Sequence, residues 1–188
     1  MARLLDRGDS VLVVVDAQPG FLSSADSGVM ARMAWLVRVA AALGVPILVT
    51  EEQPDRNGST DRAIADVLPR GTPVLTKPVF GLADVPEILA AVEDTGRRTA
   101  VLVGAETDVC VAHSALGLLD HEYRVAVVAD ATHSPGLMHE HGLRRIADAG
   151  GTVLHAKGVY YEWLRTVEAA TDFRRDHPEL GDPPGFSL

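Results

Sequence analysis

The stretch Val11–Asp16, with the sequence VLVVVD, joins five consecutive aliphatic residues to a carboxylate. A strand with one face in water alternates apolar and polar residues, whereas this run is apolar at every position. Such a run predicts a strand buried on both faces, which is typical of parallel sheets covered by helices on both sides. We therefore expect Val11–Val15 to form a central parallel strand and Asp16 to lie at its carboxyl end.

Short apolar runs of the same kind recur along the chain, and helical patterns separate them. Further strands are predicted at Pro46–Thr50, Pro73–Thr76, Thr99–Val103, Arg124–Ala129 and Thr152–His155. Helices are predicted at Met30–Leu43, Asp61–Leu68, Pro86–Val92, Asp108–His121 and Leu137–Ala149, with one more in the C-terminal tail from Tyr160. This alternation predicts one α/β domain over residues 1–188. We expect a three-layer, doubly wound (Rossmann-like) sheet of six mainly parallel strands in the order 3-2-1-4-5-6.

The overall charge and the cysteine content limit the partners and the compartment. The net charge is −9, which disfavours nucleic acid and anionic membranes as partners. A single cysteine cannot form an internal disulfide, which fits a reducing cytoplasm. The first ten residues, MARLLDRGDS, lack the apolar core of a signal peptide, and no apolar run approaches the roughly 18 residues of a membrane span. We therefore expect a cytoplasmic protein.

Three chemically capable side chains converge at one point of the predicted sheet. Strands 1 and 4 are neighbours in this order, and ligands of such sheets bind where the order reverses. Asp16 ends strand 1, and the loop after strand 4 leads to Cys110, the only cysteine. Lys77 lies at the end of strand 3, where Pro78 favours an extended backbone. From position alone each residue also has a plainer interpretation, as a loop starter, a packed thiol or a solvated charge.

Taken together, the carboxylate, the ammonium and the thiol suit nucleophilic attack on a carbonyl group. The thiolate is the nucleophilic form of cysteine, and its ordinary pKa of about 8.5 falls near a helix N-terminus or a cation. A carboxylate can take the thiol proton and return it to a leaving group. A lysine between them reduces the repulsion between the two anions. Backbone N–H groups around Glu106 and Cys110 would then bind the oxyanion.

Three segments of the chain also resemble a known family. They are VLVVVDAQPGFL at 11–22, TKPVFGL at 76–82 and VLVGAETDVCVAHSALGLLDHEYRVAVVADAT at 101–132. These segments are similar to the signature segments of the isochorismatase-like cysteine hydrolases, in the same order and spacing. The resemblance implies a doubly wound α/β fold with Asp16, Lys77 and Cys110 as the catalytic triad. It further implies a cis peptide bond between Ala105 and Glu106 that turns the Glu106 N–H toward the oxyanion.

The same resemblance implies several residues of the substrate pocket. Gln18 and Phe21, from the pattern Asp-x-Gln-x-x-Phe, would line or support the pocket, as would Phe80. For the two aromatic residues, packing in the core is an open alternative. His133 follows the fifth strand at the carboxyl edge of the sheet, so it too is a candidate for contact with substrate.

Departures from the family's patterns narrow the chemistry. Members that hydrolyse the vinyl ether isochorismate lack the cysteine, so the presence of Cys110 favours attack on an amide-like carbon. Nicotinamidases of the family carry an Asp-x-His metal motif after the second strand, but TEEQPDRNGST at 50–60 contains no histidine. The chain thus resembles the metal-free subgroup of isochorismatase-domain proteins, and we expect neither a metal nor a cofactor.

The sequence thus predicts a cysteine hydrolase that cleaves a small C–N amide through a covalent thioester. One alternative is a vinyl ether hydrolase with Asp16 as general acid, and another is a non-catalytic ligand-binding or thiol-sensing protein of the same fold. The partner would be a small-molecule substrate. The segment Val159–Leu164, VYYEWL, would leave an apolar patch on a monomer, which favours a homo-oligomer, either a dimer or a tetramer.

Overall fold

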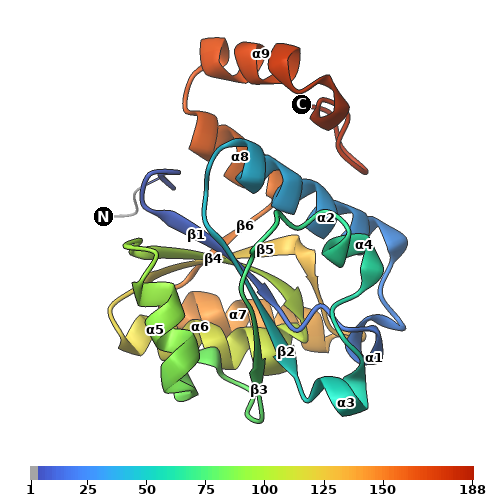
Figure 1. Cartoon of the computed structure of the whole chain (residues 1–188), viewed down its shortest axis with the longest axis vertical. Coiled ribbons are helices and arrows are strands. Elements are labelled where there is room, and N and C mark those ends of the chain that lie inside the picture. The colour runs from blue at the N-terminus through green and yellow to red at the C-terminus, as the bar shows by residue number, and fades with distance from the viewer. Residues whose placement is uncertain (1–3) are drawn as a thin grey trace.

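The computed structural model describes residues 4–188 and contains one six-stranded sheet (Figure 1). Residues 1–3, which begin the charged N-terminal segment, lie outside the described residues. Every neighbouring pair of strands is parallel, and the order is β3-β2-β1-β4-β5-β6, which confirms the predicted topology. The strands are β1 (Ser10–Val15), β2 (Ile47–Glu52), β3 (Val74–Lys77), β4 (Thr99–Ala105), β5 (Arg124–His133) and β6 (Thr152–Leu154).

Helices connect these strands and cover both faces of the sheet. The α-helices are α1 (Pro19–Leu22), α2 (Ser27–Ala42), α3 (Pro54–Asn57), α4 (Arg62–Ala65), α5 (Pro86–Glu93), α6 (Ala112–Asp120), α7 (Met138–Asp148), α8 (Ala156–Leu164) and α9 (Val167–Asp176). Short 3-10 turns lie at η1 (Leu82–Asp84) and η3 (Pro178–Leu180), and a π-helical turn, η2, spans Thr107–Val111. Two differences from prediction matter here. The helix expected from Asp108 begins as the π-turn, and the tail holds two helices.

The uniformly apolar strand β1 is buried on both faces because its alternate side chains enter two separate cores. Leu12 and Val14 join the core formed with α2, α4, α8 and α9, whereas Val13 and Val15 join the core formed with α5, α6 and α7. Figure 1 shows α2 and α8 on one side of the sheet and α5, α6 and α7 on the other. This is the three-layer arrangement that the sequence predicts, and it places the central strand ends at one edge.

Backbone geometry at the end of β1 brings two strand ends unusually close. Gly104 has a φ of +123°, and a side-chain carbon there would overlap the carbonyl oxygen of Val15. Asp16 itself has a φ of +46°, a conformation that residues with side chains rarely adopt and that tends to occur at functional sites. The missing side chain at Gly104 therefore lets β4 and its following loop pass directly beside Asp16.

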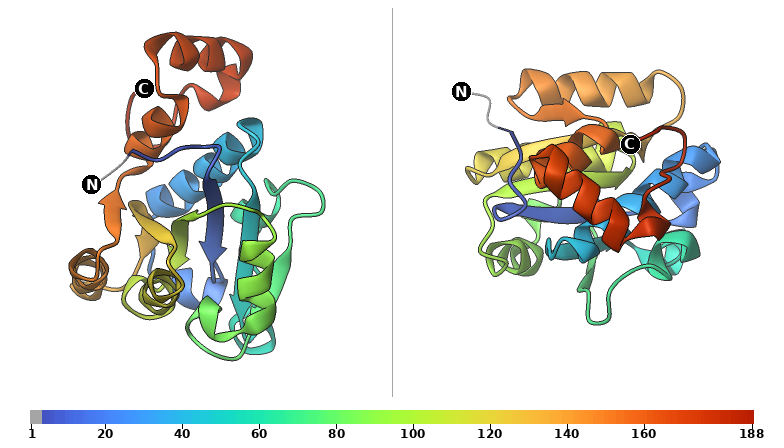
Figure 2. Two further views of the ribbon diagram at one scale, coloured as in Figure 1. Left: turned by 90° about the vertical axis from the view of Figure 1, so that its left-hand side faces the viewer. Right: turned by 90° about the horizontal axis from the view of Figure 1, so that it is seen from above.

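The apolar side chains of the C-terminal helices pack against other helices of the same chain. Tyr160 and Trp163 of α8 are buried, and the Tyr160 ring lies 5.6 Å from the rings of Trp35 in α2 and Phe173 in α9. Figure 2 shows α9 standing above α8 on the side away from the sheet. The apolar patch expected at Val159–Leu164 is thus largely covered within one chain. That reason for a homo-oligomer is wrong, because α2 and α9 supply the cover expected from another subunit.

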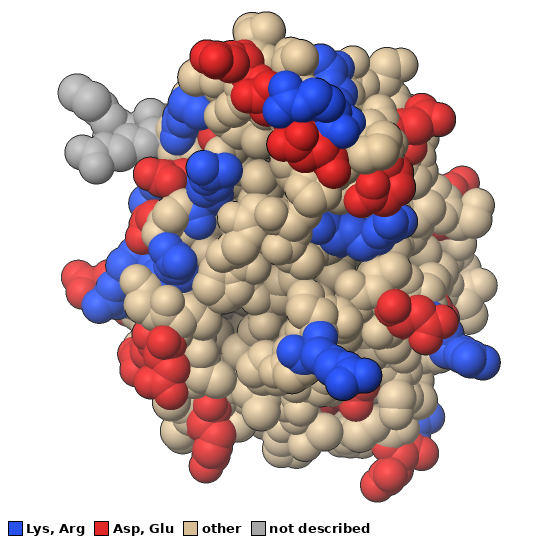
Figure 3. All heavy atoms as spheres, turned by 45° about the horizontal axis from the view of Figure 1, so that its top comes forward, with Lys and Arg blue, Asp and Glu red and all other residues tan. Residues whose placement is uncertain are grey.

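Helix length and surface charge are the two features that relate to membrane and nucleic-acid partners. Among residues 4–188, no helix is both long and apolar enough to cross a membrane. Acidic and basic side chains are interspersed over the face shown in Figure 3, which includes the C-terminal helices. This mixed pattern differs from the continuous basic surface typical of nucleic-acid-binding proteins.

Candidate active site

Asp16, Lys77 and Cys110 meet at the carboxyl edge of the sheet. Asp16 follows β1, Lys77 ends β3, and Cys110 lies in η2, the π-turn after β4. One carboxylate oxygen of Asp16, one of Glu52 and the Cys110 Sγ all lie within 4.8 Å of one another. The topology therefore brings together three groups that are far apart in the sequence, together with a fourth that the sequence analysis did not identify.

Asp16 and Lys77 form a buried ion pair with few unused hydrogen bonds. The Lys77 Nζ lies 2.5 Å from the Asp16 Oδ2, and both side chains are fully shielded from solvent. The ammonium also donates to the carbonyl oxygens of Val79, at 3.0 Å, and Phe80, at 2.8 Å. The other oxygen of Asp16 accepts a hydrogen bond of 2.8 Å from Thr50 Oγ1. All three ammonium protons are thus engaged, which holds the cation in one place.

Burial controls the protonation of the two reactive groups. Burial raises the pKa of Asp16 above its ordinary value, although Lys77 and the hydrogen bonds from Thr50 and Cys110 oppose the rise. Burial also raises the pKa of the Cys110 thiol strongly, and the negative charge of Asp16 adds to the effect while Lys77 opposes it. The thiol is therefore protonated at neutral pH, and Asp16 is a stronger base than an exposed carboxylate.

This protonation state differs from what the sequence suggests for Cys110. A cysteine at a helix start beside a lysine is expected to have a lowered pKa. In the structure the thiol is only 2% exposed, and it faces two carboxylates while the lysine is already paired with one of them. Desolvation and the nearby anions outweigh the favourable charges, so a free thiolate is not the resting form.

Glu52 is the site residue that the sequence analysis missed. Its Oε2 accepts a hydrogen bond from the Cys110 Sγ at 3.4 Å. The strand predicted to end at Thr50 continues as β2 to Glu52, which pairs in register with Lys77 of β3. The signal that could have revealed it is the acidic pair directly after the apolar run, since the carboxyl end of β2 borders the same crevice as Asp16.

The Gln18 side chain holds the carboxyl end of β2 through hydrogen bonds. It is fully buried and contacts no solvent. The Gln18 amide oxygen accepts the Glu52 backbone N–H at 2.7 Å, while its Nε2 donates to the Glu52 carbonyl oxygen at 3.0 Å and to the Gly58 carbonyl oxygen. A second side chain, Asn57, donates to the same Glu52 carbonyl oxygen at 2.9 Å. Gln18 thus holds the backbone that carries Glu52.

The other predicted pocket residues lie at different depths. Phe21 is half-buried and packs against the core that contains α2. Phe80 is 50% exposed, and its ring meets the His113 ring edge-on at 5.6 Å, while its carbonyl oxygen accepts from Lys77. His133 ends β5, and its Nε2 lies 3.1 Å from Ser24 Oγ. Phe21 is therefore a packing residue in the structure, whereas Phe80 and His133 present surface to solvent.

The loop that leads to the thiol contains an unusual peptide bond. The bond between Ala105 and Glu106 is cis, as the family resemblance implies. Glu106 is half-buried, and burial, followed by the charges of Asp108 and Glu52, raises its pKa. After this bond the chain enters η2, whose residues Val109 and Val111 both donate backbone N–H groups to the Glu106 carbonyl oxygen.

One group of side chains could in principle offer a metal ion several ligands. Among residues 4–188, Asp16, Glu52 and Cys110 are the only set of at least three acidic, cysteine or histidine side chains with converging donor atoms. The Lys77 ammonium lies on the same Asp16 carboxylate and occupies the position of a cation. A divalent ion there would stand against this positive charge in a buried site, so these residues fit a metal poorly.

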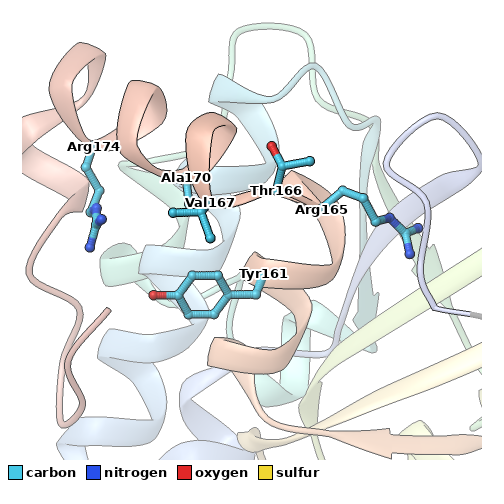
Figure 4. Close-up of a pocket in the computed structure, with 6 residues that line it drawn as sticks. All are labelled: Tyr161, Arg165, Thr166, Val167, Ala170 and Arg174. Atoms are coloured by element: carbon cyan, nitrogen blue, oxygen red, sulfur yellow. The ribbon is translucent and has the colours of Figure 1, made fainter.

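A separate pocket of about 280 Å³ lies between the C-terminal helices. Figure 4 shows the residues that line it, which come from α8, α9 and their connection: Tyr161, Arg165, Thr166, Val167, Ala170 and Arg174. None of the residues around the thiol contributes to this pocket, so it belongs to a different part of the surface.

Comparison with known proteins relates this geometry to a family. The model of the isochorismatase domain matches residues 10–157. Isochorismatase domain-containing protein 1 from Danio rerio is 36% identical over 135 residues, which are 71% of this chain and 47% of that protein. The chain therefore spans about half the length of this relative.

Two relatives have similar lengths to this chain. The probable hydrolase YcaC from Escherichia coli is 27% identical over 188 residues, covering 92% of this chain and 88% of that protein. Its solved structure, described as an octameric hydrolase of unknown specificity, has a TM-score of 0.84 at 24% identity and covers 96% of this chain and 94% of that chain. YcaC from Pseudomonas aeruginosa, solved with hexane-2,5-diol and covalent acrylamide, has a TM-score of 0.85 at 25% identity and covers 96% and 90%.

Proposed function

Because this chain belongs to the isochorismatase domain family, whose relative YcaC is a probable hydrolase, we propose that it is a cysteine hydrolase acting on a small C–N amide. The observation that carries the proposal is the buried Asp16 carboxylate, which contacts both the Lys77 ammonium and the Cys110 thiol. A base, a nucleophile and a fixed cation within one buried site are the parts that acyl transfer through a thioester requires.

In the first half of the reaction, the Cys110 sulfur attacks the substrate carbonyl carbon as Asp16 takes the thiol proton. Asp16 is suited to this step because its raised pKa makes it the stronger base. The backbone N–H groups of Glu106 and Cys110 stabilise the oxyanion of the tetrahedral intermediate. The C–N bond then breaks, Asp16 returns the proton to the leaving nitrogen, and the acyl group remains on sulfur as a thioester.

In the second half, a water molecule attacks the thioester carbonyl carbon. Asp16 takes a proton from this water, the C–S bond breaks, and the carboxylic acid product leaves. The sulfur regains its proton from Asp16, which restores the starting state. Throughout both halves Lys77 stays positively charged and stabilises the single negative charge, whether it lies on Asp16 or on the transient thiolate.

The two alternatives differ in what Cys110 does. A vinyl ether hydrolase would use Asp16 as a general acid and would need no nucleophile. A ligand-binding or thiol-sensing protein would keep a reactive thiol without turnover. YcaC from P. aeruginosa was solved with covalent acrylamide, which fits a reactive nucleophile in that relative but does not distinguish catalysis from sensing. We further propose a small-molecule substrate and a homo-oligomer, for which the octamer of E. coli YcaC is the supporting case.

The decisive experiment compares wild type, Cys110→Ala and Asp16→Asn on a panel of small primary amides and on a vinyl ether. For an amide hydrolase we expect turnover of at least one amide, a loss of about 10³-fold or more in kcat/KM for each variant, and an acyl adduct on wild type by intact-protein mass spectrometry. Retained vinyl ether turnover by Cys110→Ala would select the first alternative. Absence of any turnover, with a thiol that still reacts, would select the second.

A further inference from the structure

The most informative feature outside the proposed triad is the side chain of Glu52. It accepts the Cys110 thiol at 3.4 Å, and within residues 4–188 it has no lysine, arginine or histidine partner. Lys77 is its register neighbour on β3, yet all three of the ammonium's protons go to Asp16, Val79 and Phe80. A carboxylate without a counter-ion thus faces the sulfur that is proposed to become an anion.

The backbone that carries this carboxylate is held by the surrounding structure. Gln18 and Asn57 make hydrogen bonds to both backbone groups of Glu52, and the following residue, Gln53, has a φ of +40°. Among the described contacts, the hydrogen bonds of the buried Gln18 amide go only to Glu52 and to the neighbouring Gly58. A strained backbone held by a buried side chain indicates a fixed position for Glu52.

Further carboxylates lie near Glu52. Glu106 lies close enough to Glu52 and Asp108 for both carboxylates to influence its titration. Burial lowers the pKa of His133 and of His139, so neither imidazole supplies a cation at neutral pH. Lys77 is neutralised by Asp16. A ligand with a positive charge would therefore balance the negative charges of these carboxylates.

We propose that Glu52 is a specificity-determining residue that selects amide substrates carrying a cationic group or several N–H donors close to the scissile carbon. This inference rests on the proposed hydrolase function, which supplies the amide. When Asp16 removes the thiol proton, the sulfur anion lies beside the Glu52 carboxylate, and the two repel each other. A substrate ammonium or amidinium group that binds Glu52 relieves this repulsion, so the correct substrate assists formation of its own nucleophile.

The proposal can be tested on the thiol without knowing the natural substrate. The cationic 2-aminoethyl methanethiosulfonate and the anionic 2-sulfonatoethyl methanethiosulfonate are similar in size. In each, the sulfur of Cys110 forms a mixed disulfide and expels methanesulfinate. The measured quantity is the ratio of the two modification rates, divided by the same ratio for 2-mercaptoethanol. We expect this ratio to favour the cation in wild type and to fall about tenfold in Glu52→Gln.

Two further variants make the result specific. Asp55→Asn removes the same charge from an exposed position three residues away and is expected to leave the ratio unchanged. Glu52→Asp retains the charge and is expected to retain the preference for the cation, which separates an electrostatic role from a structural one. A Glu52→Gln ratio equal to that of Asp55→Asn would overturn the inference.

Turnover then separates this inference from the proposed function. β-Alaninamide, butanamide and succinamate share the CH2–CH2–C(O)NH2 unit and carry a positive, a neutral and a negative end group, the first two of nearly equal size. We expect kcat/KM to fall in that order in wild type and to become nearly level in Glu52→Gln. Cys110-dependent turnover without a charge order would refute the role of Glu52 alone. A charge-selective thiol without turnover of any amide would refute the hydrolase and leave Glu52 as the selector of a bound cationic ligand.

Discussion

At the scale of single residues, Asp16 is the centre of the site because it is the shared partner of the cation and the thiol. Its carboxylate binds the Lys77 ammonium through one oxygen and Thr50 through the other, and it also contacts Cys110. The thiol proton therefore has a nearby acceptor, although the thiol itself has a raised pKa. Because the thiol is protonated and Asp16 is a strengthened base, we expect the thiol to lose its proton to Asp16 only as the sulfur attacks the substrate.

We expect Asp16→Asn to lower the pKa of Cys110 while reducing amide turnover. The substitution removes an anion that raises the pKa of the thiol. It also frees Lys77, whose positive charge lowers the pKa of the thiol. The wild-type midpoint should lie above that of an ordinary thiol, and the midpoint of the variant should lie below the wild-type value. The pH dependence of Cys110 alkylation by iodoacetamide measures both midpoints.

Asp55→Asn is the matched control for this experiment, because it removes one exposed carboxylate without touching the site. Its alkylation midpoint should equal that of wild type. A higher alkylation midpoint in Asp16→Asn than in wild type would mean that Asp16 stabilises the Cys110 thiolate. The conclusion that the Asp16 carboxylate raises the pKa of the thiol would then be wrong.

At the scale of secondary-structure elements, the π-turn η2 depends on the close approach of α7. Gly142 of α7 lies against the backbone of η2, where a side-chain carbon would be 2.7 Å from the Cα and the N of Asp108. Contact at this distance requires backbone movement, since Asp108 offers no flexible side-chain atom there. The absence of a side chain at Gly142 therefore helps to fix the turn that carries Cys110.

Gly142→Ala should destabilise the protein by about 1–3 kcal/mol, the usual cost of adding a methyl group to a tightly packed contact. Gly158 in α8 provides the comparison, because the nearest atom to a side chain there is Leu154 Cδ2 at 3.9 Å. Gly158→Ala should stabilise the protein by about 0.5–1 kcal/mol through the better helix propensity of alanine. Urea unfolding followed by circular dichroism measures both, and equal effects of the two substitutions would contradict the packing argument.

At the scale of the whole molecule, the sheet order places the site and the C-terminal helices in different regions. The carboxyl edge carries the thiol, whereas α8 and α9 enclose their own small pocket. Exposed apolar side chains remain in both regions, with Leu137 68% exposed near the start of α7 and Val167 85% exposed at the start of α9. Such side chains are the candidates for contacts between copies of the chain.

We expect the purified protein to self-associate, because burying these apolar side chains between subunits is favourable. Light scattering coupled to size-exclusion chromatography at micromolar concentrations should give a mass that is a multiple of one chain. Leu137→Glu and Val167→Glu place a charge in each region in turn, and the variant that lowers the mass identifies the interface. A monomeric mass for wild type would refute the expectation.

By itself the sequence determined the sheet order and the meeting of Asp16, Lys77 and Cys110. Strands such as Val11–Val15, apolar at every position, favour burial between two helical layers, and right-handed connections then give a doubly wound sheet, for which the family resemblance supports the order 3-2-1-4-5-6. Only the tertiary structure decided that Glu52 faces the thiol and that the pKa of Cys110 is raised. The acidic pair after the second apolar run marks Glu52 as a candidate, but its contact with the thiol depends on how far β2 extends. The raised pKa depends on burial and on distances between residues far apart in the sequence, which a local pattern does not contain.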